Sequence, residues 1–334
     1  MEDVLHKLFN LYPCDEQSTT VRQFFWAAVV LSWVLSFVPQ GGRCRNYSIV
    51  DRLWSLFPLM LVMQWVNQHV ESTQQQPLGS KALVAASLVA AWSLRLTYNA
   101  FRRGDFAVGA EDYRWAYVQK SFDRMFGARG VVRVVAWEVF NFTFISLFQL
   151  GLLYQISVPV RQVIIATATE DTKWSVSEIA LAVLMSLLLV AETIADQQQY
   201  ELQRLKRPGV LDAEPDQDYA QRRKAEVEAG FVYSGLWRFS RHPNVFCEQA
   251  FWAVMAVFAA TATKSTGDYC VFVTGPALLI ALMWASVGLT ESITLGKYPM
   301  YRAYQLKTSR LVPCLPRTNA HVVGSAHKHQ KKAE

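Results

Sequence analysis

Residues 179–195 read IALAVLMSLLLVAETIA, a run in which Glu192 is the only charged residue. With the residues that flank it, this run is long enough for a helix that crosses the hydrocarbon core of a bilayer, which takes about 20 apolar residues. Similar runs make seven in all, at about 22–40, 48–66, 81–100, 134–158, 176–196, 245–263 and 270–290. The sequence therefore predicts an all-α protein, a polytopic membrane helical bundle of about seven transmembrane helices. Because the fourth run ends at Pro159, we expect that helix to tilt or kink there.

The composition agrees with a membrane protein. Of the 334 residues, 52% are hydrophobic and 18% are charged, against roughly 25% charged residues in an ordinary soluble domain. The five cysteines have no CxxC or zinc-like spacing, which predicts free, mostly buried thiols and no metal site.

Lysine and arginine predict the orientation of the helices. With the N-terminus outside, the inward loops and the C-terminal tail hold 26 of the 33 basic residues and the outward segments hold six. The positive-inside rule therefore places the C-terminus in the cytosol. Because the charge follows topology, the net charge of +6 does not indicate a nucleic-acid partner.

The ends of the chain suggest three parts. Residues 1–44 hold an N-terminal segment and the first transmembrane helix, 45–315 form the main membrane domain, and 316–334 form a basic cytosolic tail. The final Lys331-Lys332-Ala333-Glu334 resembles the dilysine retrieval signal of endoplasmic reticulum membrane proteins, which predicts that location. The loop at 201–232 is charged enough to predict partial disorder.

Charged side chains occur within or at the ends of the predicted spans, at Asp51, Arg52, Arg95, Glu138, Glu192, Asp196, Glu248 and Glu291. A charge deep in hydrocarbon costs at least about 2.5–3.5 kcal/mol, so such residues are rare and often functional. With the predicted orientation all of them lie towards the cytosol. This arrangement predicts one water-accessible chamber that opens to the cytosol. The alternative is that these groups only make polar contacts between helices.

Two spacings support the chamber. At about 100° per residue, Glu138, Asn141 and Gln149 lie within about 60° of one another, which predicts a polar stripe on the fourth helix. Glu192 and Asp196 are a like-charged pair four residues apart. That pairing is unfavourable unless a cation, a proton or a ligand lies between the two carboxylates.

Residues 235–248 read GLWRFSRHPNVFCE and lead from a cytosolic loop into the sixth span; we call them the signature segment. Pro243 suits the first turn of a helix, whose free N–H groups attract anions. Arg238, Arg241 and His242 add cationic donors at the same end. The segment thus predicts a site for an anion such as a phosphorylated cofactor, with lipid headgroups as the alternative ligand.

The signature segment resembles the GLWRxSRHPNYFGE motif of the steroid 5-alpha-reductase-like membrane proteins, in particular the branch called DUF1295. Four other stretches resemble that branch in the same order, namely SIVDRLW at 48–54, LR at 94–95 with GAEDYR at 109–114, ADQQ at 195–198, and YRAY at 301–304 with Thr308, Ser309 and Pro313. The likeness covers roughly 45–315. Val245 and Cys247 depart from it, because the branch usually has Tyr and Gly there.

The resemblance implies an enzyme that holds NADPH in a cytosol-facing chamber and reduces a carbon–carbon double bond in a lipid or steroid-like substrate. Carried over by position, the residues assigned to the cofactor are Arg238, Arg241, His242, Asn244, Glu248, Tyr301, Arg302 and Tyr304, with Asp196 and Lys206 as secondary candidates. Arg238 and Arg241 would take phosphates, while Asn244 and Glu248 would bind the nicotinamide amide or ribose. Depth and polarity alone suggest Asp51, Tyr98 and Glu138 as the catalytic proton donor.

Two other functions are compatible with the sequence. Isoprenylcysteine and phospholipid methyltransferases share a related Arg-His-Pro segment, which would make the cofactor S-adenosylmethionine. The departures at Val245 and Cys247 would instead suit a non-catalytic membrane protein that binds a sterol or another lipid. The sequence distinguishes neither a sterol from a fatty acyl or polyprenyl chain nor one oligomeric state from another.

Overall fold

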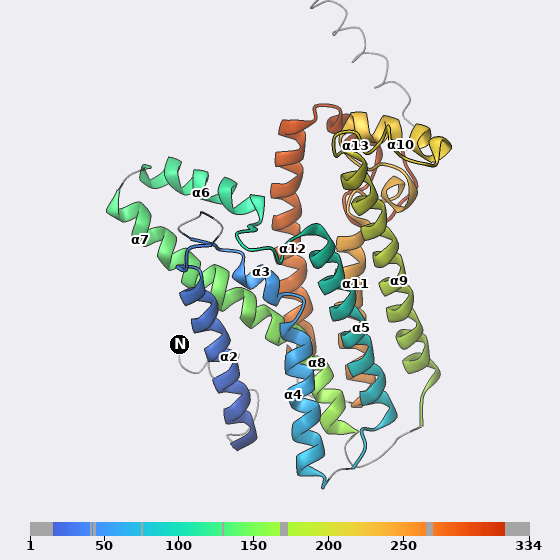
Figure 1. Ribbon diagram of the computed structural model, residues 1–334. Helices are drawn as coiled ribbons and strands as arrows, with labels where there is room; N and C mark the ends of the chain where they lie inside the picture. The colour runs from blue at the N-terminus through green and yellow to red at the C-terminus, as the bar shows by residue number, and fades with distance from the viewer. Residues whose placement is uncertain are drawn as a thin grey trace, which may run out of the picture. The chain divides into compact units, whose positions relative to one another are not determined.

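The computed structural model describes residues 16–40, 42, 45–74, 76–128, 130–167, 173–264 and 270–317. Lys331 and Lys332 of the predicted retrieval signal lie outside these residues. The described chain forms helices joined by loops (Figure 1), with one isolated bridge between Ser240 and Ser309. The helices are α2 (Glu16–Leu35), α3 (Ile49–Leu53), α4 (Phe57–Ser72), α5 (Ser80–Arg103), α6 (Tyr113–Phe126), α7 (Val131–Phe140), the π-helix η1 (Asn141–Phe148), α8 (Gln149–Ala166), α9 (Val176–Leu205), α10 (Gln217–Ala229), the 3₁₀-helix η2 (Gly235–Arg238), α11 (Pro243–Ala262), α12 (Cys270–Lys297) and α13 (Tyr301–Lys307).

Every apolar run predicted to span the membrane is helical over most of its length, which confirms the all-α membrane bundle. Four helices are long and apolar enough to cross a bilayer, namely Val131–Ala166, Val176–Leu205, Pro243–Ala262 and Cys270–Lys297. The part of α2 at Thr19–Leu35 is apolar but shorter. The remaining two predicted spans correspond to α3 with α4 and to α5. The chain is therefore an integral membrane protein.

The chain divides into two compact units. The first unit holds residues 1–186 and 252–280, and the second holds 187–251 and 281–334. Helices α9, α11 and α12 each contribute residues to both units.

Close helix packing organises the first unit. Helix α4 packs along α8, and a side chain at Gly275 of α12 would place its Cβ 2.7 Å from the main-chain nitrogen of Ile156 in α8. Only glycine permits such an approach of two backbones. A buried ion pair adds to this packing, since Lys81 Nζ lies 2.7 Å from Glu178 Oε1. Removing either partner of such a pair would leave an uncompensated buried charge.

The fourth predicted span differs from expectation in where it is irregular. The helix continues through Pro159 to Ala166, and the irregular turn is instead the π-helix η1. Proline is tolerated inside membrane helices because neighbouring groups can satisfy the freed carbonyl.

The i→i+5 bonding of η1 also changes the angle between successive side chains, so the predicted polar stripe is only partly correct. Asn141 Nδ2 still lies 3.4 Å from Glu138 Oε2 and also donates to Ser36 Oγ at 3.0 Å. Gln149 instead accepts a hydrogen bond of 2.7 Å from Trp54 Nε1.

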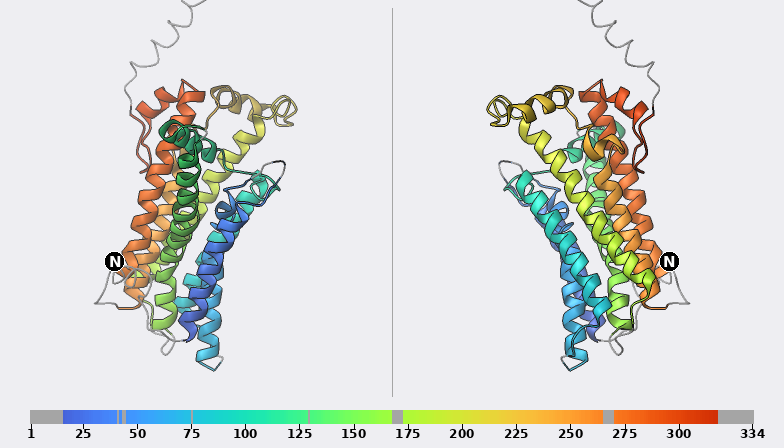
Figure 2. Two further views of the ribbon diagram at one scale, coloured as in Figure 1. Left: turned by 90° about the vertical axis from the view of Figure 1, so that its left-hand side faces the viewer. Right: turned by 90° about the vertical axis from the view of Figure 1, so that its right-hand side faces the viewer.

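The second unit contains a helix where partial disorder was predicted, and that prediction is wrong for residues 217–229. Helix α10 begins at the N-cap Asp216, whose side chain accepts from the Tyr219 N–H at 2.8 Å, and ends at Gly230 with φ of +86°. Lys206 Nζ donates to the Gly230 carbonyl at 3.0 Å and to the Tyr298 hydroxyl at 2.9 Å. These bonds hold α10 beside the C-terminal ends of α9 and α12 (Figure 2). The charged residues of this stretch therefore form a capped helix that is fixed at its end.

Of the cysteines that the structure describes, Cys247 is buried, whereas Cys270 and Cys314 are exposed. The prediction of mostly buried thiols is therefore wrong for two of these three residues. No group of three or more His, Cys, Asp or Glu side chains that could hold a metal ion occurs among the described residues.

Candidate functional site

The signature segment is anchored to α9 by side chains around η2. Gly235 has φ of +59°, and any Cβ there would collide with the Gln198 side chain. Gln198 Oε1 accepts from the Leu236 N–H at 3.1 Å, and Trp237 Nε1 donates to the Ala195 carbonyl at 3.1 Å. The glycine that opens the segment is thus required both for its backbone conformation and for space.

Residues 308–317, which we call the C-terminal strap, run along the signature segment. The Arg241 N–H donates to the Ser309 carbonyl at 2.8 Å, and the Cys314 N–H donates to the Phe239 carbonyl at 2.9 Å. The Tyr304 hydroxyl, just before the strap, donates to the Trp237 carbonyl. Two stretches more than 60 residues apart in sequence thus form one substructure.

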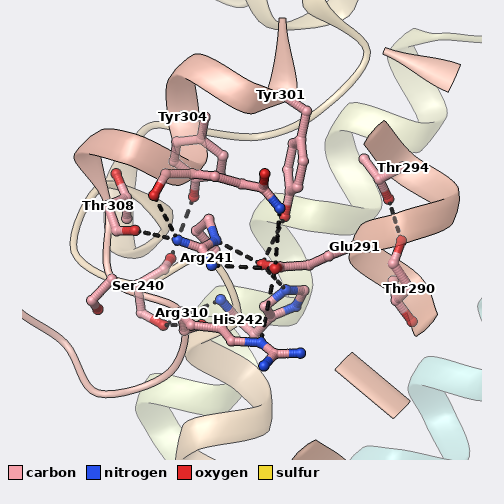
Figure 3. Close-up of polar contacts among 12 residues, drawn as sticks. Ser240, Arg241, His242, Thr290, Glu291, Thr294, Tyr301, Tyr304, Thr308 and Arg310 are labelled. Carbon is pink, nitrogen blue, oxygen red and sulfur yellow. Dashed lines mark hydrogen bonds and ion pairs between the residues drawn. The ribbon is translucent and has the colours of Figure 1, made fainter. Parts of the chain in front are cut away.

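The carboxylate of Glu291, on α12, is the centre of this substructure (Figure 3). Arg241 contributes two bonds, from Nε to Oε1 at 2.6 Å and from Nη2 to Oε2 at 3.2 Å. His242 Nε2 lies 3.1 Å from Oε1, the Tyr301 hydroxyl donates to Oε1 at 3.3 Å, and Gln305 Nε2 donates to Oε2 at 3.2 Å. We call Glu291 and the side chains around it, including Arg310 described below, the Glu291 cluster.

Arg241 uses all three of its nitrogens within the chain. Its Nη1 donates to the main-chain carbonyls of Gln305 at 3.0 Å and Thr308 at 2.5 Å, in addition to the two bonds to Glu291. The side chains of Arg241 and Glu291 are only 10% and 9% exposed. A phosphate on Arg241 would have to displace Glu291 or these carbonyls, so the structure favours a positioning role for this residue.

Two buried tyrosines of α13, Tyr301 and Tyr304, lie beside the Glu291 cluster. Burial raises the pKa of both the Tyr301 and the Tyr304 phenol, so both stay protonated and act as hydrogen-bond donors at neutral pH. The Phe231 ring stacks on Tyr304 with centroids 5.4 Å apart and meets Tyr301 edge-on at 5.0 Å. These rings fix α13 against the signature segment.

Asn244, in the first turn of α11, forms a hydrogen bond with Asp196 of the predicted Glu192–Asp196 pair. Its Nδ2 donates to Asp196 Oδ1 at 3.1 Å, while its Oδ1 is buried with no hydrogen-bond partner among the described residues. Glu192, Asp196 and Glu248 are all buried. A buried acceptor without a partner costs about 1–3 kcal/mol, so Asn244 Oδ1 is a position where a ligand's N–H or O–H would stabilise the fold.

The other predicted cofactor residues lie elsewhere in the second unit. Arg238 is exposed, and Arg302 is also exposed and donates to Gln305 Oε1 at 3.3 Å. Lys206 is held by Gly230 and lies over the Tyr298 ring, 4.9 Å from its centroid. Of the eight motif-matched residues, Arg241, His242 and Tyr301 contact Glu291, and Tyr304 holds the signature segment beside them.

The three predicted proton donors belong to the first unit, so the single shared chamber stays a prediction. Asp51 accepts from Trp115 Nε1 at 3.0 Å. Glu138 forms an ion pair with Arg45. Tyr98 is 64% exposed, and the guanidinium of Arg102 lies 5.4 Å from the centre of its ring.

Two more motif stretches meet in the first unit, around α3 and the start of α6. Arg52 donates to the main-chain carbonyls of Asp105 at 3.1 Å, Ala107 at 3.2 Å and Ala110 at 3.0 Å. The Asp112 N–H donates to Ser48 Oγ at 2.8 Å. The motif residues at 48–54 and 109–114 therefore have a structural role, because they tie a loop to α3.

The sequence assigns no cofactor role to three residues of the cluster, namely Glu291, Gln305 and Arg310. Glu291 stands out in the sequence only as a charge at the end of the seventh predicted span. Arg310, whose Nε lies 3.8 Å from Glu291 Oε2, was not singled out at all. The signal for Glu291 was its burial cost in a span. Arg310 gave no local signal, because its neighbours in space come from α12.

The residues of the second unit fit part of a dinucleotide. The free acceptor of Asn244 suits the amide group of a nicotinamide, and the exposed Arg238 suits a phosphate. Arg241 fits a phosphate-binding role poorly, because each of its three nitrogens already bonds to Glu291 or to a main-chain carbonyl.

Comparison with known proteins shows the family to which the chain is similar. The model of the family described as "Protein of unknown function (DUF1295)" matches residues 24–308. An uncharacterized protein of Schizosaccharomyces pombe is 31% identical over 300 residues, which cover 87% of this chain and 80% of that protein. No solved structure matches the chain.

Proposed function

From the premise that this chain belongs to the DUF1295 family of membrane proteins, we propose that it is an NADPH-dependent oxidoreductase that reduces a carbon–carbon double bond in a lipid or steroid-like substrate. The observation that carries the proposal is the buried, unpartnered Oδ1 of Asn244. This acceptor lies in the first turn of α11, directly after the segment that the Glu291 cluster fixes in place.

The chain's own groups would bind and orient the cofactor. Asn244 Oδ1 would accept from the carboxamide NH₂ of a nicotinamide, while Asp196 keeps the Asn244 amide oriented through its 3.1 Å bond to Nδ2. Orientation of this kind matters because small misplacements of reacting groups slow a reaction strongly. When bound, NADPH supplies the hydride. Asp51, Tyr98 and Glu138 remain the candidates for delivering the proton.

Binding measurements on the detergent-purified protein test the proposal. We expect the wild type to bind NADPH, and Asn244→Ala to weaken that binding about tenfold or more through loss of a buried hydrogen bond. Asn67→Ala is the matched control, because Asn67 is exposed on α4 and its Nδ2 donates to Glu71 Oε1 at 2.7 Å, within the same helix. If Asn244→Ala binds NADPH as tightly as the wild type does, Asn244 does not contact the cofactor and the proposal loses its support.

The alternative functions give different results in the same assay. Binding of S-adenosylmethionine without NADPH would indicate a methyltransferase. Binding of a sterol or another lipid without either cofactor would indicate a non-catalytic lipid-binding protein. For the reductase, lipid analysis of cells that lack the protein should show one unsaturated species accumulating.

We further propose that the protein resides in the endoplasmic reticulum with a cytosolic C-terminus. The distribution of lysine and arginine supports the orientation, and the Lys331-Lys332 pair supports the location. A cytosolic second unit would give the site direct access to NADPH.

A further inference from the structure

Arg310 and Arg241 both face Glu291 but differ in how many of their donors are used. Arg310 Nη2 makes one long hydrogen bond, 3.4 Å to the Trp284 carbonyl, and its guanidinium lies 4.8 Å from the centre of the Trp284 ring. Its Nε is buried without a hydrogen-bond partner among the described residues, 3.8 Å from Glu291 Oε2. Buried guanidinium donors are normally satisfied. Arg310 therefore has unused donors beside a cluster in which all three nitrogens of Arg241 are hydrogen-bonded.

The charges of the Glu291 cluster do not balance. Two guanidinium groups, those of Arg241 and Arg310, face the single carboxylate of Glu291, and the His242 ring adds a further cation whenever it is protonated. Tyr301 and Gln305 are neutral. The cluster thus carries at least one positive charge in excess, and an anion at Arg310 would compensate it.

Glycine at position 288 makes room for Arg310 against α12. A Cβ at Gly288 would lie 2.9 Å from Arg310 Nη2. Trp284, Gly288 and Glu291 lie four and three residues apart, on one face of α12, so the Arg310 side chain lies along that face. In Figure 3 the terminal nitrogens of Arg310 point away from Glu291. The Arg310 side chain as a whole is 28% exposed, so part of it is accessible to a ligand.

We propose that Arg310 binds a phosphate group of an anionic ligand, with Glu291 and Trp284 holding its guanidinium in position. The planar fork of an arginine matches two phosphate oxygens, which lysine cannot do. If the ligand is a nucleotide, the phosphate would belong to NADPH, and the inference then rests on the proposed function. A phospholipid headgroup offers the same chemistry.

Two probes separate these sources, namely NADPH with the detergent-purified protein and phosphatidic acid added to phosphatidylcholine nanodiscs. We expect Arg310→Gln to weaken NADPH binding about tenfold or more, as loss of a charge-assisted pair does. Arg310→Lys should be intermediate because it keeps only the charge. Gly288→Ala should also weaken binding, since its methyl group displaces a flexible side chain without disturbing the backbone.

Arg317→Gln is the matched control, because it removes the same charge from an exposed position in the strap. If the wild type fails to bind NADPH but phosphatidic acid raises its unfolding temperature and Arg310→Gln abolishes that rise, the ligand is a lipid headgroup. The inference then stands and the proposed function fails. If NADPH binds and Arg310→Gln matches Arg317→Gln, the inference is overturned and the proposed function stands. Equal responses of both variants to both probes would likewise overturn the inference.

Discussion

The Arg241 guanidinium binds both oxygens of the Glu291 carboxylate, at 2.6 Å and 3.2 Å. Through this pair a residue two positions before α11 is joined to the C-terminal part of α12. The Nη1 nitrogen of Arg241 bonds to the carbonyls of Gln305 and Thr308, so the same side chain also fixes the strap. One buried arginine thus connects three segments that are distant in sequence.

Removing the carboxylate should destabilise the protein strongly. In Glu291→Leu the buried Arg241 loses its counter-ion, which we expect to lower the free energy of unfolding by about 3–5 kcal/mol. The double variant Arg241→Met, Glu291→Leu should regain part of that loss, because the buried Arg241 charge that lost its partner is removed as well. Denaturant titration of the detergent-purified variants gives both numbers. Equal stability of Glu291→Leu and the wild type would show that the pair is not buried in the folded protein.

The close approach at Gly275 should tolerate no side chain. Gly275→Ala places a methyl group against the main chain of α8, and such overpacking costs about 1–3 kcal/mol. Gly151→Ala, within α8, is the matched control, because nothing lies within 4 Å of its added Cβ. In a helix interior the alanine at 151 should stabilise by about 0.5–1 kcal/mol. The unfolding temperature should therefore fall in Gly275→Ala and rise in Gly151→Ala. A shift of both unfolding temperatures in the same direction would contradict the packing of α12 on α8.

Asp112 should make the free energy of unfolding depend on pH in the acid range. Burial alone would raise its pKa, but the hydrogen bonds and charge of Arg114 outweigh burial and lower the pKa. Because the folded pKa is the lower one, the stabilisation is complete above the unfolded value of about 4 and is lost as pH falls through the folded value. The difference in unfolding free energy between the wild type and Asp112→Asn should be constant from about pH 7 to 5 and shrink below about pH 4. Asparagine keeps the helix N-cap, so a difference that does not change with pH would refute the ionic contribution.

The orientation can be tested with glycosylation tags. A tag in the loop between α4 and α5 should be modified in the endoplasmic reticulum lumen. A tag in the loop between α9 and α10 should not be modified, because the stretch between the fifth and sixth predicted spans is rich in lysine and arginine and is therefore expected in the cytosol. The mobility shift on a gel, removed by an endoglycosidase, measures both. Modification of the second tag alone would reverse the proposed topology.

The seven apolar runs predicted the helical membrane bundle correctly, since bilayer crossing depends on local hydropathy and length, which a single stretch of sequence contains. Pro159 shows the limit of local reasoning. A proline is a helix breaker in isolation, yet α8 continues through it, and the irregular turn occurs at η1 instead. In a membrane bundle, neighbouring groups can satisfy the carbonyl that a proline leaves free, and a local sequence pattern does not contain those neighbours.

The helical membrane fold and the resemblance of the signature segment to one family can be read from the sequence alone, because hydropathy and motif spacing run along the chain. The three-dimensional arrangement is needed to see that every nitrogen of Arg241 is bonded, that Arg310 Nε is not, and that both side chains face Glu291. The physical reason is that an ion pair depends on separation in space, and these partners lie 50 and 19 positions apart along the chain.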